Sequence, residues 1–185
     1  FKTPLAGIVV RIFDLGNQGR EVVNLDTRNY TVVTGEADNT SQIASASFTE
    51  AGLLDLCAQR DPICISGNSQ FRNVRFDLRP DGAVIYVEVD TGVFWQQIGL
   101  VLRLQADRTR FEVIGVDIDG STYNVMTLPA FIPEATRTTI RQAVNDIERE
   151  GNQILDNLVM LTGGEDYRLS DITIDDTLLT LILRG

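Results

Sequence analysis

A regular alternation of apolar and polar side chains in the middle of the chain limits its fold more than any other feature. Over residues 71–80, Val74, Phe76 and Leu78 alternate with arginine and aspartate. Because successive side chains of a β-strand point to opposite faces, this pattern predicts a strand with one buried and one solvated face. Strand-like segments follow at 83–90, 93–105, 111–118 and 121–128, with turns at 80–82, 107–109 and 119–120. Consecutive strands joined by short turns predict an antiparallel meander.

Two segments instead show the spacing of helices. Ser47–Glu50 has the S-x-x-E sequence of a capping box and precedes a leucine-rich stretch, which predicts a short helix near 49–60. A long amphipathic helix is predicted over about 133–160, because apolar residues recur there every three or four positions and most charges lie off that stripe. The stripe consists of Ile140, Ala143, Val144, Ile147, Ile154, Leu155 and Leu158.

The two ends of the chain differ in how clearly they indicate structure. Residues 167–174 and 177–185 predict a closing pair of strands, the second almost wholly apolar. Near the N-terminus, 22–25 and 30–33 are candidate strands, and the polar stretch 35–42 is typical of an exposed loop. The 185 residues therefore predict one α+β domain, with an N-terminal segment of uncertain structure at 1–42 and a core at 43–185.

Composition excludes several functions. The net charge is −10 and the only lysine is Lys2, so the chain has no basic cluster that could follow a nucleic-acid backbone or an anionic bilayer. Histidine is absent, which excludes Ser-His-Asp and Cys-His relays and His-ligated zinc. We therefore expect no catalytic residue, metal or cofactor. The first residue is Phe1, from which we expect a leader or membrane anchor upstream of this sequence.

The two cysteines, Cys57 and Cys64, are separated by six residues. Two cysteines cannot form a zinc site alone, and this spacing is not the C-x-x-C of a redox motif. Two alternatives remain: a disulfide that closes a small loop in an oxidising compartment, or two buried thiols. The Asp61-Pro62 turn between them could bring the two residues together.

Two groups of acidic residues resemble sites and are better explained otherwise. Asp117–Ser121 resembles the start of a calcium loop, but the later oxygen ligands are missing, so a hairpin turn is predicted. The carboxylates near the C-terminus lie in predicted turns and on the outer face of a strand, which is typical of solvated surface. They are Glu165, Asp166, Asp171, Asp175 and Asp176.

A set of aromatic and aliphatic residues in the predicted sheet is the main candidate for a binding site. Its members are Phe76, Tyr86, Val87, Val89, Phe94, Trp95, Leu100, Leu102, Leu104, Phe111 and Val113, with Val144 and Ile147 from the helix. One interpretation is an ordinary core. The other is a groove between sheet and helix that accepts an acyl chain.

The order of these segments resembles bacterial single-domain members of the tubular lipid-binding (TULIP) superfamily. The resemblance covers about 43–185 and rests on a pattern of elements rather than on single residues. In order, the segments are SFTEAGLLDLCAQ, FRNVRFDLRPDGAVIYVEVDTG, LVLRLQADRTRFEVIGVDIDG, IPEATRTTIRQAVNDIEREGNQIL and YRLSDITIDDTLLTLILRG. The resemblance implies an extracytoplasmic domain whose curved antiparallel sheet wraps one long helix, with a groove that holds lipid in some relatives.

We therefore expect a non-enzymatic bacterial domain of the cell envelope or a secreted one, which binds a lipid or another hydrophobic small molecule in that groove. It would meet a membrane only through an anchor outside this chain. The alternative is a structural or interaction module of a cell-envelope assembly, with a filled core and no ligand. In that case an envelope protein partner would cover an exposed apolar patch or a sheet edge.

Overall fold

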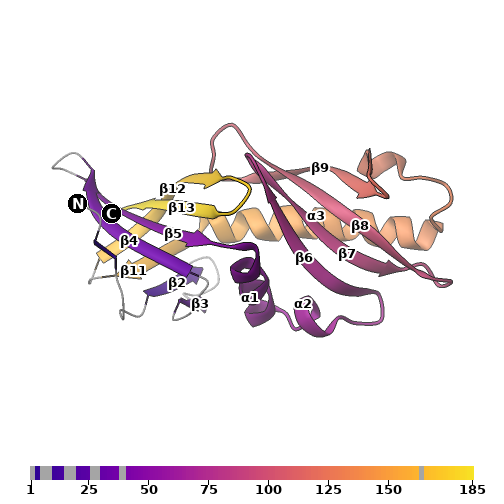
Figure 1. Ribbon diagram of the computed structural model, residues 1–185, viewed down its shortest axis with the longest axis horizontal. Coiled ribbons are helices and arrows are strands. Elements are labelled where there is room, and N and C mark those ends of the chain that lie inside the picture. The colour runs from indigo at the N-terminus through magenta and orange to yellow at the C-terminus, as the bar shows by residue number, and fades with distance from the viewer. Residues whose placement is uncertain (1–2, 5–9, 15–19, 26–29, 38–40, 163–164) are drawn as a thin grey trace.

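The computed structural model describes residues 3–4, 10–14, 20–25, 30–37, 41–162 and 165–185. In this part of the chain the fold is α+β, with two antiparallel sheets and few helices arranged along an elongated molecule (Figure 1). The predicted α+β class is confirmed, whereas the prediction of one sheet is wrong.

The five-stranded sheet is the predicted meander. Its strands are β6 (Phe71–Arg79), β7 (Gly82–Asp90), β8 (Trp95–Leu104), β9 (Phe111–Ile118) and β10 (Ser121–Tyr123). They are neighbours in chain order, β10-β9-β8-β7-β6. The last strand is shorter than predicted, because a 3-10 turn (η2, Val125–Thr127) follows it. The alternation on β6 is confirmed, with Leu78 buried and Arg75 and Arg79 exposed.

The eight-stranded sheet combines both ends of the chain, in the order β1-β4-β5-β13-β12-β11-β2-β3. Its N-terminal strands are β1 (Thr3–Pro4), β2 (Val10–Asp14), β3 (Arg20–Leu25), β4 (Tyr30–Ala37) and β5 (Ser41–Phe48). Its C-terminal strands are β11 (Leu158–Thr162), β12 (Glu165–Ile174) and β13 (Leu179–Arg184). The candidate strands at 22–25 and 30–33 are confirmed as parts of β3 and β4.

The loop predicted over 35–42 is wrong at both of its ends, because β4 continues to Ala37 and β5 begins at Ser41; residues 38–40 lie outside the described residues. The error arose because small and polar residues such as those of β5 are typical of loops. Here Ala44 and Ala46 are fully buried under the rest of the sheet. The apolar strand β13 lies between β5 and β12, which satisfies both of its edges.

Helix α1 (Glu50–Arg60) begins two residues later than the predicted capping box requires, because Thr49 and not Ser47 is its N-cap. The hydroxyl of Thr49 accepts a hydrogen bond from the Gly52 N–H at 3.1 Å and caps the helix. Ser47 belongs to β5, where its hydroxyl bonds the Thr180 hydroxyl at 2.8 Å. The Glu50 carboxylate accepts the Leu78 N–H at 2.9 Å, so it ties α1 to the edge strand β6.

A disulfide joins Cys57 of α1 to Cys64 of α2 (Ile63–Ser66), a short helix that the sequence did not predict. The two Cα atoms are 5.8 Å apart. Of the two alternatives for these cysteines, the disulfide is confirmed. It packs α2 beside α1. After α2, the Asn68 N–H donates a hydrogen bond of 2.7 Å to the carbonyl of Phe71, the first residue of β6.

Helix α3 spans Glu134–Asp156, and the predicted end at 160 is wrong because Leu158 already belongs to β11. The helix is bound to the free edge of β9. Strand β10 pairs only with the last part of β9, from Val116 to Ile118, so within the described part of the chain the first half of β9 has no strand on that side. There the Asn152 side chain accepts the Phe111 N–H at 2.8 Å and donates to the Phe111 carbonyl at 2.7 Å. The Glu148 carboxylate accepts the Val113 N–H at 3.2 Å.

Replacing Asn152 with alanine should lower the free energy of unfolding by about 1–3 kcal/mol, because two half-buried backbone groups of Phe111 lose their partner. Urea unfolding followed by circular dichroism measures this loss. Gln153→Ala is the control, since Gln153 is exposed on the next position of the same helix. Equal unfolding midpoints for the two variants would show that the edge of β9 does not depend on α3.

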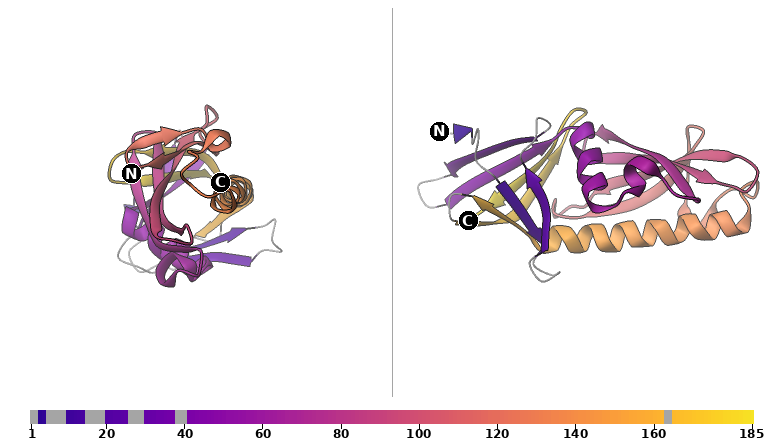
Figure 2. Two further views of the ribbon diagram at one scale, coloured as in Figure 1. Left: turned by 90° about the vertical axis from the view of Figure 1, so that its right-hand side faces the viewer. Right: turned by 90° about the horizontal axis from the view of Figure 1, so that it is seen from below.

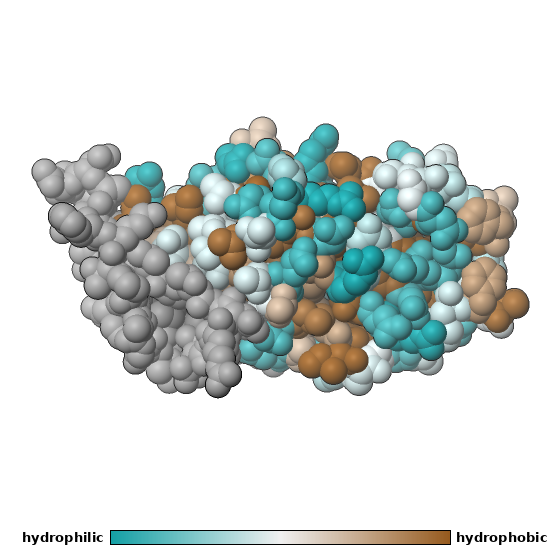
Figure 3. All heavy atoms as spheres, viewed as in Figure 1, coloured by the Kyte–Doolittle hydropathy of each residue, from teal (hydrophilic) through white to brown (hydrophobic). Residues whose placement is uncertain are grey.

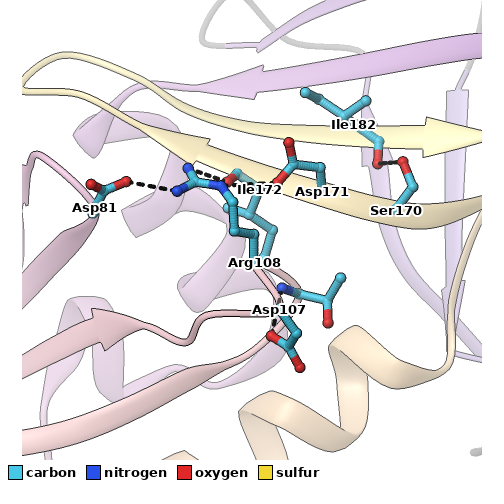
Figure 4. A network of polar contacts seen from close by, with 8 residues as sticks. Asp81, Asp107, Arg108, Ser170, Asp171, Ile172 and Ile182 are labelled. Carbon is cyan, nitrogen blue, oxygen red and sulfur yellow. Dashed lines mark hydrogen bonds and ion pairs between the residues drawn. The ribbon is translucent and has the colours of Figure 1, made fainter.

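The two sheets meet at a joint centred on Arg108, which lies between β8 and β9 (Figure 4). Its guanidinium reaches Asp171 at 3.1 Å, Asp81 at 3.1 Å and the carbonyl of Ile172 at 2.9 Å. The Ile172 N–H also donates to the Arg108 carbonyl at 2.8 Å. The adjoining buried cluster, here called the joint core, draws side chains from both sheets. It consists of Ala44, Ala46, Phe48, Leu78, Ala83, Leu104, Leu158, Tyr167, Ile172, Ile174, Leu181 and Leu183.

Candidate functional site

A second buried cluster, here called the helix–sheet core, lies between α3 and the five-stranded sheet (Figure 2). The sheet contributes Val87, Val89, Ile98, Leu100, Val116 and Ile118, the segment before α3 contributes Leu128 and Ile132, and α3 contributes Ile140 and Val144. These side chains are apolar and nearly free of solvent. They hold the helix on the inner face of the sheet.

The predicted ligand-binding residues fall into four groups. Val87, Val89, Leu100 and Val144 are buried in the helix–sheet core, and Leu102, Val113 and Ile147 are half-buried at its margin. Leu104 is buried in the joint core, with Phe111 half-buried against it. Four residues belong to neither core: Phe76, Tyr86 and Trp95, which are half-buried, and Phe94, which is exposed. Tyr86 lies beneath the Arg75 guanidinium. Seven of the thirteen thus lie in or against one core, and the other six lie elsewhere.

Coverage of the inner face is uneven. A helix with its side chains is about 10–12 Å wide, whereas five strands spaced by about 4.8 Å extend over about 19 Å. Helix α3 is bound to β9. On β8 and β9 the inward residues Ile98, Leu100 and Val116 are fully buried, whereas Leu102 and Val113 are half-buried. On β6 and β7, farther from the helix, four apolar side chains are only half-buried. They are Phe71, Val74, Phe76 and Ile85, here called the inner strip.

The strand register places the inner strip on one face. Phe71 pairs with Val89 and Phe76 with Ile85. Between these pairs β6 has a bulge, where Asn73 has a φ of 54°. The extra residue lets Val74 point inward while its neighbours keep their alternation. Every inward side chain of β6 and β7 is therefore apolar along the strip.

A second apolar surface lies at the end of the molecule farthest from the eight-stranded sheet, here called the apolar tip. It consists of Val93, Phe94, Met126 and Phe131, all exposed. Figure 1 places the turn after β7 and the segment before α3 at this end, and Figure 3 shows apolar surface there. The turn is held in place by Thr91, whose hydroxyl donates to the Phe94 carbonyl at 2.7 Å.

Trp95, at the start of β8, has a polar partner. The Arg72 guanidinium lies 4.1 Å from the centre of its ring and also bonds the Glu88 carboxylate at 2.6 Å. Hydrogen bonds from Arg72 and then Asn73 hold the pKa of the Glu88 carboxyl below its usual value. Trp95 is therefore stacked under an ion pair on the outer face, away from the inner strip.

Two of the C-terminal acidic residues considered in the sequence have structural partners. Asp171 belongs to the Arg108 joint, and the Asp175 carboxylate accepts the N–H groups of Thr177 and Leu178 in the turn before β13. The predicted turn at Asp119-Gly120 is confirmed as the link between β9 and β10.

Among the described residues, no group of three or more His, Cys, Asp or Glu side chains is placed to hold a metal ion. None of the described helices is both long and apolar enough to cross a bilayer.

Sequence reasoning missed Phe71, Val74 and Ile85 of the inner strip and most of the apolar tip. Val74 was recognised in the alternation of β6, so its inward direction was predictable. Its partial exposure was not, because that depends on where α3 lies. Val93 and Met126 were missed because they fell within the predicted strands 93–105 and 121–128. Phe131 had a signal, since it lies between Pro129 and Pro133 outside any predicted strand or helix.

Searches of protein-family models, of curated proteins and of solved structures each found no match to this chain.

Proposed function

We propose that this chain is a non-enzymatic binding domain that holds a lipid or another hydrophobic ligand between the five-stranded sheet and α3. In this proposal the sheet is the curved wall, α3 is the long amphipathic helix that it wraps, and the ligand lies along the inner strip. The observation that carries the proposal is that four neighbouring inward side chains of β6 and β7, Phe71, Val74, Phe76 and Ile85, are all only half-buried.

The chemistry of the strip favours an aliphatic ligand. Its side chains offer no charge and no hydrogen bond, so affinity would come from removing apolar surface from water. Each buried methylene contributes about 0.8 kcal/mol, and a chain of several methylenes would bind without a polar anchor. Specificity would then depend on the length and width of the ligand rather than on its head group.

The proposed location is extracytoplasmic. The Cys57–Cys64 disulfide supports it, because disulfides persist in oxidising compartments and are rare in the cytosol. The TULIP resemblance, which rests on the order of elements, leads to the same location and to the same class of ligand.

The test starts with the chain purified without detergent, extracted with organic solvent and analysed for lipid by mass spectrometry. Uptake of a fluorescent fatty acid is then measured for the delipidated chain and for Phe76→Glu. Phe76 belongs to neither core, so this change should leave the fold intact, and a charge on the strip should weaken fatty-acid binding about tenfold or more.

Ile65→Glu is the matched control, because Ile65 lies on α2 and is 73% exposed. Its uptake should equal that of the unchanged chain. Circular dichroism checks that both variants fold. Equal uptake by Phe76→Glu and the control, or no uptake by the unchanged chain, would remove the inner strip as a ligand site.

The second candidate function is an interaction module of the cell envelope. The apolar tip favours it, since four large apolar side chains are held in solvent at one end of the molecule. A chain that carries no lipid and takes up no fatty acid would give this function the stronger support.

A further inference from the structure

The outer face of the five-stranded sheet carries a polar hollow of about 470 Å³. It is lined by Arg75, Arg79, Tyr86, Gln97, Asp117, Asp119 and Gly120. We propose that this hollow binds a small zwitterion, a molecule with a carboxylate at one end and an ammonium group at the other. The site is on the opposite face of the sheet from the inner strip, so it is independent of the proposed lipid function.

Two arginines, Arg75 and Arg79, make one side of the hollow positively charged, and both contact Tyr86. The Arg75 guanidinium stacks on the Tyr86 ring, 3.9 Å from its centre. Arg79 donates to the Tyr86 hydroxyl at 3.2 Å and to the Asp77 carboxylate at 3.0 Å, and these two partners, Asp77 first, raise its pKa. In the described part of the chain Arg75 makes no ion pair, so its N–H groups remain available to a carboxylate. A stacked guanidinium is oriented for such two-pronged binding.

The other side presents negative charge. Asp117 lies next to the last residue of β9 and accepts the Gly120 N–H at 3.2 Å through one carboxylate oxygen, which fixes its direction. Asp119 lies in the following turn, and the Gln96 amide donates to it at 3.5 Å. Neither carboxylate pairs with an arginine among the described residues. Both can therefore accept hydrogen bonds from an ammonium group.

Strand register keeps these two sides apart and leaves a floor between them. Arg75 pairs with Tyr86, Tyr86 with Gly99, and Gly99 with Asp117, so these four residues form one row across β6 to β9. With strands about 4.8 Å apart, the backbones at the two ends of the row are about 14 Å apart. Arg75 and Asp117 therefore do not neutralise each other.

Gly99 shapes the hollow by letting the Tyr86 ring lie flat against the sheet. A Cβ atom at this position would lie 2.7 Å from Val84 Cγ1 and 2.9 Å from Tyr86 Cε1. The Tyr86 ring therefore covers Gly99, and this ring, held between Arg75 and Arg79, forms the floor of the hollow. A zwitterion also suits the whole chain, because a net charge of −10 repels free anions at long range and does not repel a molecule of zero net charge.

The test uses isothermal titration calorimetry of the full chain with ε-aminocaproate, which carries one carboxylate and one ammonium on a flexible stem. Hexanoate and hexylamine are the controls, since each keeps the stem and one of the charges. Binding of ε-aminocaproate should be about tenfold to a hundredfold tighter than binding of either control. If hexanoate binds as tightly as ε-aminocaproate, the hollow is an anion site, and if hexylamine does, it is a cation site. If no probe produces heat, the hollow is not a binding site. Each of these three results overturns the proposal.

Two variants locate the site. Arg75→Gln and Asp117→Asn should each weaken ε-aminocaproate binding by about tenfold or more, and the asparagine can still accept the Gly120 N–H. Arg103→Gln is the control, because Arg103 is an exposed arginine of β8 that pairs with Glu112 and does not line the hollow. Thermal unfolding checks each fold. Unchanged binding in both variants, or equal loss in Arg103→Gln, overturns the assignment, and fatty-acid uptake should be the same in all three variants.

Discussion

The change Phe48→Ala is expected to destabilise this protein by about 3–5 kcal/mol, the usual cost of deleting a buried phenylalanine. Phe48 is only 1% exposed and ends β5. It belongs to the joint core, where β5, β12 and β13 of one sheet meet Leu78, Ala83 and Leu104 of the other. The loss of free energy of unfolding should therefore affect both sheets.

Urea unfolding with two probes tests this expectation. The chain has one tryptophan, Trp95, at the start of β8, so its fluorescence reports on the five-stranded sheet, while far-UV circular dichroism reports on the whole fold. Both transitions should move together, because the joint core and the Arg108 contacts couple the two sheets. Phe131→Ala, at an exposed site, should change stability by less than about 0.5 kcal/mol. A fluorescence transition that stays in place while the dichroism transition moves would show that the sheets unfold separately.

Replacing Ile140 with alanine should lower the free energy of unfolding by about 2–5 kcal/mol. Ile140 is 1% exposed and lies on α3 in the middle of the helix–sheet core. The change removes its apolar contacts and leaves a cavity between helix and sheet, which costs more when the neighbours cannot move in.

Gln142→Ala is the matched control for Ile140, because Gln142 is exposed on the same helix and alanine suits a helix. Calorimetric or urea unfolding gives both values. A loss of less than about 1 kcal/mol for Ile140→Ala, below the usual range for such a change, would show that α3 is loosely packed on the sheet. Loose packing of α3 would also leave more space beneath the helix for a hydrophobic ligand.

The five-stranded sheet could be predicted from the sequence because its information is local. Alternation along 71–118 defines which side chains point inward, and turns such as Pro80–Gly82 join neighbours in chain order. The disulfide remained one of two alternatives, because the spacing of Cys57 and Cys64 does not determine whether they meet. The short helix α2, which contains Cys64, was missed, since four residues show no helical periodicity.

The eight-stranded sheet could not be predicted in the same way. Its pairing of β5 with β13, in which Ala44 lies opposite Leu183, joins positions far apart in the chain. No local pattern encodes such a partner. The predicted loop 35–42 included the first two residues of β5, Ser41 and Gln42, because polar residues without an apolar pattern are typical of loops.

The sequence by itself determined which residues are apolar, which faces of β6 to β9 they occupy and which chemistries are excluded, because these follow from residue type and the two-residue period of a strand. Only the tertiary structure decided how far each apolar residue is covered. Asn152 and Glu148 bind α3 to the edge of β9. Since one helix is narrower than five strands, most inward side chains in the middle of β8 and β9 are buried, whereas all four side chains of the inner strip remain half-buried. The polar hollow arises in the same way, because only the register of four strands brings Arg75, Gly99 and Asp117 into one row.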